Sequence, residues 1–581
     1  MDHSLTRFRS ENGKERGLSY YHNPGSEPLR MKTIGQILDE AAAKCPNQEA
    51  VISHYEKKTI TFLETKKRAE QLGAGFLDLG LKPGDRIALI GVNTIHWYIT
   101  ALACAKAGLI VVMLNPGYQA SELEYALKKV EAKAVISDHK FKTQNYPAML
   151  MTLAKGMAST PHSQPLSCPE LPDLSYVIVA TEENLPGCYR LQDIMKLAKG
   201  METIRAVQET IQPDDPYCIQ FSSGTTGVPK GAVISHFALV NSSYYTGKRA
   251  GIHEKISTAC LPLPLFHIFG TSVGIILGLN LQITLIFPAP IFLKECVIQT
   301  LQTYQTDMVF GTPTMLHDLY KELDILLPKS PELQEACAKV ELVGTGGSNI
   351  PSDLIKNLSK VFPNGDFIGA LGMTEAGATC FLLSRDDKLE DKYNTVGRVM
   401  DHLEVKVVDE NGRMVPFGTP GEVWYRSFSN LLEYWSDEKV TNEAKTKSGW
   451  FKSGDVIVLR EDGYASVKGR IKHIIIRGGE NIFPVEIENF LHSHPDILEA
   501  EVYGVDDTRM GEEVAASIKL KPSSTLTEAK IKEYCKGKIS HFKIPKYIRF
   551  VDSFPLTATR KVQKFLLKKI HEKELQEQTK K

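Results

Sequence analysis

Apolar residues follow two different spacings in the first third of the chain, and their alternation predicts strands separated by helices. Apolar runs of strand length occur at residues 60–62, 86–90, 110–114 and 134–137. Between them, apolar residues recur every three or four positions over residues 34–44 and 63–79, which is typical of amphipathic helices, and a more continuously apolar segment predicts a third helix over 94–106. Such alternation predicts an α/β fold with right-handed crossovers, in which a largely parallel sheet is covered by helices on both faces.

Two helix starts carry a capping signature. Thr33 followed by Gln36 predicts a capping box at the start of the helix over 34–44. Ser121 followed by Glu124 predicts the same arrangement ahead of the helix that precedes the strand at 134–137.

The most apolar stretch, residues 268–287, is the one candidate for a membrane span. Glycines and polar residues interrupt it at Gly270, Gly274, Gly278, Asn280 and Gln282. A span needs about 20 predominantly apolar residues. The interruptions therefore favour a buried strand-helix-strand segment of the core over a membrane span.

The pattern of predicted elements changes in the second half of the chain. Short strands separated by glycine turns over residues 395–468 predict a smaller β-rich subdomain. Beyond residue 473, the pattern predicts a small α+β domain with strands at 498–505, 514–520 and 547–551 and a helix at 527–536. A chain of 581 residues is too long for one core, so two or more domains are expected.

Composition restricts the partners and the compartment. The chain has 69 basic residues (lysine and arginine) and 69 acidic residues (aspartate and glutamate). Its net charge therefore creates no overall electrostatic field that would attract nucleic acid or an anionic membrane. The ten cysteines contain no C-x-x-C pair, which argues against zinc ribbons and a disulfide framework and favours a reducing compartment. The first 17 residues mix basic and acidic side chains without an apolar run, which excludes a secretory signal and matches a mitochondrial transit peptide poorly.

The strongest chemical signal follows the strand predicted at 217–221. No bulky side chain occurs between Ser222 and Gly227, and the stretch ends at Lys230. Backbone N–H groups of such a loop can surround a polyphosphate while a lysine neutralises it. Pro229 and Gly231 flank the lysine, so the loop is not the G-x-x-x-x-G-K-[ST] pattern. The alternative is an ordinary surface loop.

The stretch SSGTTGVPKG over residues 222–231 resembles the phosphate-loop signature of the adenylate-forming, AMP-binding superfamily. Residues 477–484 and 537–546 narrow the resemblance to acyl-CoA synthetases that act on medium-chain acids. It covers residues 25–570, with its motifs in the expected order. The resemblance implies a polar lead (1–24), a large adenylation domain (25–469), a hinge (470–472) and a mobile C-terminal lid domain (473–581).

It also implies an activity: ATP and a carboxylic acid form an acyl-adenylate with release of pyrophosphate, and the acyl group then passes to coenzyme A. The small partners are therefore the acid, ATP, Mg²⁺ and coenzyme A, while the oligomeric state stays open. The resemblance favours the mitochondrial matrix, with the cytoplasm as the alternative.

The resemblance assigns nucleotide contacts residue by residue. The phosphates would lie against Ser222, Ser223, Gly224, Thr225, Thr226, Gly227, Val228, Pro229 and Lys230. Adenine would lie between the turn Gly346, Gly347 and Ser348 and the position of Leu371, where the family usually has an aromatic residue. Asp455 would accept hydrogen bonds from both ribose hydroxyls, and Arg470 would also reach the nucleotide. Taken alone, the glycine turn could be a plain strand-to-helix connection, and Arg470 part of a solvated basic turn.

Four positions, in addition to Lys230, would act on the reacting groups. Thr374 would contact the α-phosphate, and Glu375 would help to hold Mg²⁺, since a hard cation prefers carboxylate and phosphate oxygens. His267 would lie at the mouth of the acyl pocket, and Lys561 would bridge the acyl carboxylate and the α-phosphate. Each has a structural alternative: a helix cap for the Thr-Glu pair, a core residue for His267 and a solvated face for Lys561.

The second half-reaction would use another face of the small domain. Gly478 and Gly479 match glycines that line the pantetheine tunnel in relatives, and Lys472 matches the pivot about which the domain rotates. Rotation of one domain can separate two chemistries in time.

The chain departs from the family pattern at Leu371, Ser427, His473 and Arg560. At the position of Arg560 the family usually has glycine. These departures support a rival function, a non-catalytic nucleotide- or acyl-binding relative. Against it, the charged residues of the motifs are all present, and a decayed site is expected to lose buried charges first.

Overall fold

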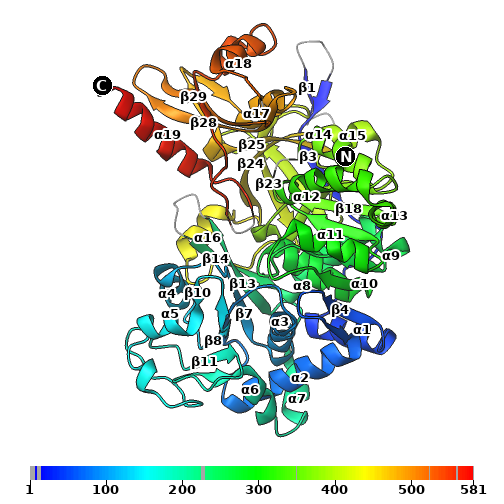
Figure 1. The fold of residues 1–581 in the computed structure, drawn as a ribbon, viewed down its shortest axis with the longest axis vertical. Helices are drawn as coiled ribbons and strands as arrows, with labels where there is room; N and C mark the ends of the chain where they lie inside the picture. Colours follow the sequence, from blue (N-terminus) through cyan, green and yellow to red (C-terminus); the bar gives the residue numbers. More distant parts are fainter. Residues whose placement is uncertain are drawn as a thin grey trace.

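The computed structural model describes residues 7–9, 15–223, 229–348, 350–522, 524–557 and 560–579. Two large helix-covered sheets form the body of the molecule, and a C-terminal part, orange to red in Figure 1, stacks on one end of it. A third sheet lies between the body and the C-terminal part (Figure 1).

The first sheet has seven strands in the order β12-β11-β8-β6-β7-β13-β14, parallel except for the last pair. Their bounds are β6 (Arg86–Ile90), β7 (Ile110–Leu114), β8 (Ala134–Asp138), β11 (Tyr176–Ala180), β12 (Tyr189–Arg190), β13 (Pro216–Ser223) and β14 (Pro229–Ser235). In β6, Ile87 and Leu89 pack into the main core while Ala88 and Ile90 pack into a second cluster on the opposite face. Both faces are therefore buried, as expected of a parallel sheet.

The second sheet has nine strands in the order β21-β20-β19-β18-β17-β15-β16-β4-β5, parallel from β19 to β4. Their bounds are β4 (Glu49–Ser53), β5 (Lys58–Thr61), β15 (Thr258–Cys260), β16 (Thr284–Phe287), β17 (Met308–Gly311), β18 (Leu342–Gly346), β19 (Asp366–Met373), β20 (Ala378–Leu382) and β21 (Arg398–Val399).

Helices cover and connect these two sheets. They are α1 (Ile34–Lys44), α2 (Phe62–Leu79), α3 (Ile95–Ala107), α4 (Ala120–Lys129), α5 (Tyr146–Leu153), α6 (Leu191–Leu197), α7 (Glu202–Thr210), α8 (His236–Arg249), α9 (Ile252–Lys255), α10 (Leu277–Leu281), α11 (Lys294–Thr303), α12 (Pro313–Leu326), α13 (Pro331–Ala338), α14 (Ser352–Val361), α15 (Leu389–Asn394) and α16 (Glu438–Ala444). Two small hairpins, β1 (Arg7–Arg9) with β2 (Glu15–Gly17) and β9 (Lys140–Phe141) with β10 (Gln144–Asn145), lie apart from the large sheets.

The third sheet is antiparallel, in the order β25-β24-β23-β22-β3. Its strands are β3 (Tyr20–Asn23), β22 (Leu403–Val408), β23 (Pro420–Ser427), β24 (Phe451–Leu459) and β25 (Ala465–Arg470). It is the β-rich segment predicted over 395–468, and β3 joins it from within the polar lead predicted over 1–24.

The C-terminal part has its own sheet, β27-β26-β29-β28, with β30 beside β29. Its elements are β26 (Ile475–Arg477), β27 (Glu480–Ile482), α17 (Pro484–His492), β28 (Ile497–Asp507), β29 (Gly511–Leu520), α18 (Glu528–Cys535), β30 (Tyr547–Phe550) and α19 (Lys564–Thr579). It has separate apolar clusters, which agrees with the small α+β domain expected beyond residue 473.

The structure corrects three local predictions. Phe62 begins α2 instead of ending a strand, because Thr61 caps the helix through the N–H of Glu64. The helix after β7 begins at Ala120 and its capping partners are Gln119 and Glu122, not Ser121 and Glu124.

The third correction concerns the apolar stretch 268–287, which begins with a π-helix (Phe269–Ile276) instead of a strand. Its glycines permit close packing, since a Cβ on Gly270 would lie 2.2 Å from the carbonyl oxygen of Pro264. Among the described residues, none of the helices is both long enough and apolar enough to span a membrane.

Candidate active site

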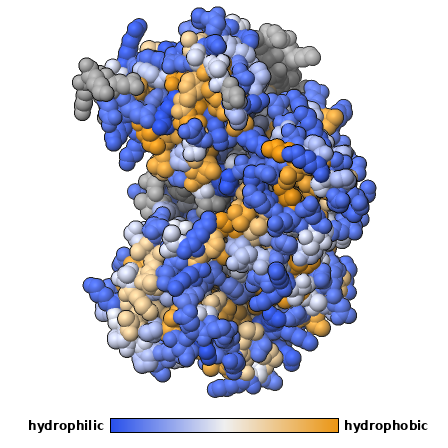
Figure 2. Space-filling model, in the orientation of Figure 1, coloured by the Kyte–Doolittle hydropathy of each residue, from blue (hydrophilic) through white to orange (hydrophobic). Residues whose placement is uncertain are grey.

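A cleft of about 2190 Å³ runs between the body, the third sheet and the C-terminal part. Figure 2 shows an indentation on the left of the molecule between the upper and lower halves, with apolar side chains above and below it. The cleft is lined by thirteen of the residues predicted from the sequence: Ser222, Pro229, Lys230, His267, Gly346, Gly347, Ser348, Leu371, Thr374, Glu375, Asp455, Arg470 and Lys561. The fold therefore gathers residues that lie as far apart in the sequence as Ser222 and Lys561.

The antiparallel pair β13–β14 presents the ends of the predicted phosphate loop. Ser222 pairs with Lys230 across the two strands, and Ser223 pairs with Pro229. Gly224, Thr225, Thr226, Gly227 and Val228 lie outside the described residues. The loop therefore leaves the sheet at the carboxyl end of β13, the end at which open α/β sheets bind ligands.

The Glu375 carboxylate forms a polar centre at the start of this loop. Its Oε1 atom accepts hydrogen bonds from Ser222 Oγ at 2.6 Å and from Tyr434 Oη at 3.0 Å. Glu375 is buried, and it follows Thr374 in a short 3-10 turn after β19. Tyr434 also lies under the Lys230 ammonium, 5.5 Å from the ring centroid. The sequence analysis missed Tyr434, and no local pattern identifies it.

The Asp455 carboxylate lies on the other wall of the cleft. Arg470 donates from Nε to Asp455 Oδ1 at 2.9 Å, and the two residues are partners across β24 and β25. Burial raises the pKa of Asp455, and the ion pair to Arg470 counteracts this effect. The second carboxylate oxygen has room to accept from a bound molecule.

Lys561 reaches the centre of the cleft from the C-terminal part. A small cavity of about 10 Å³ separates it from His267, Phe269 and Gly347. A Cβ on Gly347 would lie 3.5 Å from Lys561 Cε, an ordinary van der Waals contact, so the lysine side chain passes directly beside this turn. Burial and, secondly, the charge of Arg470 lower the pKa of Lys561 to about 8, while Asp455 and Glu375 oppose the shift.

His267 is a neutral hydrogen-bond donor in this arrangement. Burial and the neighbouring Lys561 charge lower its pKa to about 3. The backbone N–H of Phe269 donates to His267 Nδ1 at 3.2 Å, so the imidazole proton must reside on Nε2. The side chain can therefore donate one hydrogen bond to an oxygen in the cavity beside Lys561.

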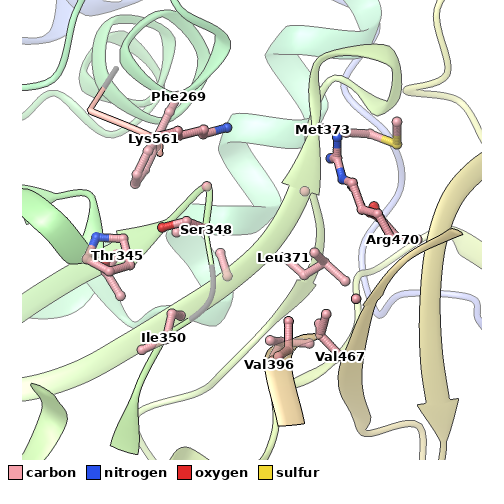
Figure 3. A pocket seen from close by; sticks show the side chains of 18 of the residues that line it. Phe269, Thr345, Ser348, Ile350, Leu371, Met373, Val396, Val467, Arg470 and Lys561 are labelled. Atoms are coloured by element: carbon pink, nitrogen blue, oxygen red, sulfur yellow. Dashed lines mark hydrogen bonds and ion pairs between the residues drawn. The ribbon is translucent and has the colours of Figure 1, made fainter. Parts of the chain in front are cut away.

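An aliphatic slot lies across the cleft from Lys561. In Figure 3, Leu371 is close to Val396 and Val467, with Ile350 on the adjacent wall and Ser348 between this slot and Lys561. Arg470 and Met373 border the same space on the other side. A flat ring system bound in this slot would contact aliphatic side chains. The family pattern, in contrast, predicts an aromatic side chain at position 371.

The hairpin of Gly478 and Gly479 is not part of the cleft. These glycines form the exposed turn between β26 and β27, with φ angles of 58° and 90°. A Cβ on Gly478 would lie 2.5 Å from Met510 Cε, whereas one on Gly479 would meet open space. The structure thus places Lys561 inside the cleft and this glycine turn outside it.

The fold and the cleft define an adenylate-forming protein, and the chain belongs to the family of AMP-binding enzymes. The family model "AMP-binding enzyme" matches residues 38–435, and the model "AMP-binding enzyme C-terminal domain" matches residues 486–561. The resemblance inferred from the sequence motifs is confirmed.

Among individual relatives, the chain is 40% identical over 561 residues to a mitochondrial medium-chain acyl-CoA ligase, ACSF2, of Danio rerio. That match covers 96% of this chain and 91% of the relative. The human ACSF2 protein is 38% identical over 568 residues, with the same coverage. An anthranilate CoA ligase in complex with anthranoyl-AMP has the same fold, with a TM-score of 0.78, 24% identity and coverage of 94% of this chain and 98% of that chain.

Replacing Tyr434 by Phe tests whether its hydroxyl supports the Glu375 centre. A hydrogen bond to a carboxylate contributes about 1.5–3 kcal/mol. We expect Tyr434→Phe to lower kcat/KM for ATP about tenfold while the far-ultraviolet circular dichroism spectrum is unchanged. Tyr464→Phe removes a similar bond to Asp387 outside the cleft, and it should leave kcat/KM unchanged. Equal effects of the two variants would show that Tyr434 acts only on stability.

Proposed function

We propose that this protein is an ATP- and Mg²⁺-dependent acid:CoA ligase that acts on medium-chain fatty acids. In the first step the carboxylate oxygen attacks the α-phosphorus of ATP, and pyrophosphate leaves. In the second step the thiol sulfur of coenzyme A attacks the acyl carbon, the thiol proton is released and AMP leaves. Such catalysis consists mainly of positioning two anions and stabilising the charge between them.

The position of Lys561 is the observation that carries this proposal. Its ammonium lies beside the neutral His267 donor, on the same side of the cleft as the turn at Gly347. A lysine charge and an N–H donor that face one small cavity suit a carboxylate that is being joined to a phosphate. An ammonium that is partly buried without a counter-ion is costly, and the carboxylate and phosphate groups of the proposed substrates would pair with it.

The other residues support the nucleotide. Asp455 would accept from the ribose hydroxyls, Arg470 would reach the nucleotide, and Leu371 would contact adenine. Thr374 would contact the α-phosphate, and Lys230 would neutralise the phosphates together with the loop from Ser222.

Glu375 fits the role of a Mg²⁺ ligand. Its Oε1 atom accepts hydrogen bonds from two donors, which orient the carboxylate. Within the described residues, no group of three or more acidic, histidine or cysteine side chains could hold a metal on its own. Phosphate oxygens of the nucleotide would complete the coordination shell, as is usual for this cation, which would neutralise charge on the phosphates.

The acid is proposed to be a fatty acid of medium chain length. Apolar side chains beyond His267 line the cleft, among them Phe266, Val273, Met308 and Phe310. They suit a hydrocarbon chain, and the relatives named as medium-chain ligases support the length. The mitochondrial matrix is the proposed compartment, because these relatives are named as mitochondrial proteins. The cytoplasm is the alternative.

We further propose that the C-terminal part turns about residues 470–472 between the two steps. The observed arrangement, with Lys561 in the cleft, serves adenylation. Gly478 and Gly479 would approach the adenylate only after rotation, where they would line the passage for coenzyme A.

The proposed activity is tested by acid-dependent exchange of pyrophosphate into ATP. With octanoate and Mg²⁺, exchange should require the acid, and octanoyl-CoA should appear when coenzyme A is added. Absence of exchange across short, medium, long and aromatic acids would contradict the proposal and favour the rival binding function.

Replacing Lys561 by Ala should affect the two half-reactions unequally. Removal of a group that stabilises charge in the transition state costs about 100-fold in rate. We expect such a loss in pyrophosphate exchange, with little change in thioester formation from preformed octanoyl-adenylate. Equal losses in both steps would refute the proposed rotation.

The lowered pKa of Lys561 predicts a pH dependence. The protonated lysine is the form that attracts the two anions, and it is lost as the pH rises through about 8. We expect kcat/KM for adenylation to fall about tenfold per pH unit above that value, since this parameter reports the free enzyme. Lys561→Arg stays protonated, so its profile should be flat to pH 10 at a lower maximum. An equal fall in both proteins would assign the titration to another group.

A further inference from the structure

The residue before Lys561 has an unfavourable backbone conformation. Arg560 has a φ angle of 60°, in the left-handed region that glycine adopts readily and other residues rarely adopt. The family pattern that the sequence resembles usually has glycine at this position. The substitution therefore adds strain to the loop that carries Lys561, and contacts elsewhere must offset it.

The Arg560 side chain makes two such contacts with the body. Its Nη2 atom pairs with Asp318 Oδ2 on α12, and its guanidinium lies 5.3 Å from the ring centroid of Phe292. Phe292 is buried and lies between β16 and α11. The side chains of Arg560 and Asp318 are 34% and 28% exposed, so this ion pair is partly shielded from water. Arginine suits such a site because its planar group can pair and stack at once.

This ion pair connects the C-terminal part to the body of the molecule. Among the residues that the structure describes, it is the only ion pair that joins residues 475–579 to residues 15–470. Helix α12 contributes Pro313, Thr314 and His317 to the cleft wall, directly before Asp318. Arg560 thus attaches the Lys561 loop to a helix that borders the reacting groups.

The loop itself is short and internally bonded. The Thr557 N–H donates to the Lys561 carbonyl at 2.8 Å, and the Lys561 N–H donates to Thr557 Oγ1 at 3.0 Å. Leu556 and Val562 form a bridge on the far side of this turn. A restraint on Arg560 is therefore transmitted to Lys561, one residue away.

We propose that Arg560 and Asp318 are positioning residues that hold Lys561 in the cleft for adenylation. The inference rests on the proposed function and adds a chain-specific control to it. The ion pair must break before the C-terminal part can turn, so it favours the first half-reaction and delays the second. Neither residue contacts the reacting atoms, and both act through Lys561.

The test uses the full-length protein and the variant Asp318→Asn, which keeps the shape but removes the charge. Asp324→Asn is the matched control, because Asp324 is an exposed residue of the same helix without an ion pair among the described residues. In Asp318→Asn we expect pyrophosphate exchange with octanoate to fall about tenfold. Thioester formation from preformed octanoyl-adenylate should be unchanged or up to about threefold faster. The control variant should match the wild type in both steps.

A double-mutant cycle links the effect to Arg560. Arg560→Gly relieves the backbone strain and removes the ion pair, so Asp318→Asn should have no additional effect in that background. A tenfold loss that persists there would show that Asp318 acts without Arg560. A loss of equal size in both half-reactions would likewise overturn the proposal, as would unchanged exchange in Asp318→Asn.

Hydrogen–deuterium exchange of the peptide 556–567 gives a readout that needs no turnover. The peptide should exchange at least about threefold faster in Asp318→Asn than in the wild type and in Asp324→Asn. Equal exchange in all three proteins would refute the ion pair as a restraint. If the wild type activated no acid while the peptide still responded, the proposed function would fail but the restraint would stand.

Discussion

The arrangement of the cleft depends on holding one ammonium group, that of Lys561, in a partly buried position at its centre. The fall of its pKa to about 8 corresponds to about 3 kcal/mol by which the charged form is disfavoured. Asp455 and Glu375 reduce this cost, while Arg470 adds to it. Two anions that entered the cleft would stabilise the charged form. The cost in the empty protein therefore becomes a gain when the substrates bind, as differential binding requires.

The two large sheets create the place for this charge. The loop after β13 leaves the first sheet at its carboxyl end, and the turns after β18 and β19 leave the second sheet at its carboxyl end. These ends face one cleft, and Tyr434 connects them through its contacts with Lys230 and Glu375. Polar groups fixed in this way need no reorganisation during a reaction, which is the basis of electrostatic preorganisation.

The sequence predicted the helices and strands more accurately than the contacts between side chains that are far apart in the chain. Strands such as Arg86–Ile90 and the capping box at Thr33 follow from local patterns, and both are confirmed. Local reasoning failed where tertiary packing decides, as at the π-helix that begins at Phe269. It also missed Tyr434 and Asp318, because a lone tyrosine or aspartate carries no signal until the fold brings it to Glu375 or Arg560. Motif resemblance supplied the remaining site residues, whose roles stay predictions.

A strained residue next to a central lysine would let the chain balance the two conformations proposed for its two reaction steps. Glycine at position 560 would leave the loop free to move. Arginine makes one conformation favourable only while its side chain contacts Asp318 and Phe292. A left-handed non-glycine residue costs about 1–2 kcal/mol, and a partly shielded ion pair with a cation–π contact is of comparable size. The opposing contributions nearly cancel, so the arrangement is held without becoming permanent. This balance is what an enzyme with two successive reactions in one cleft requires.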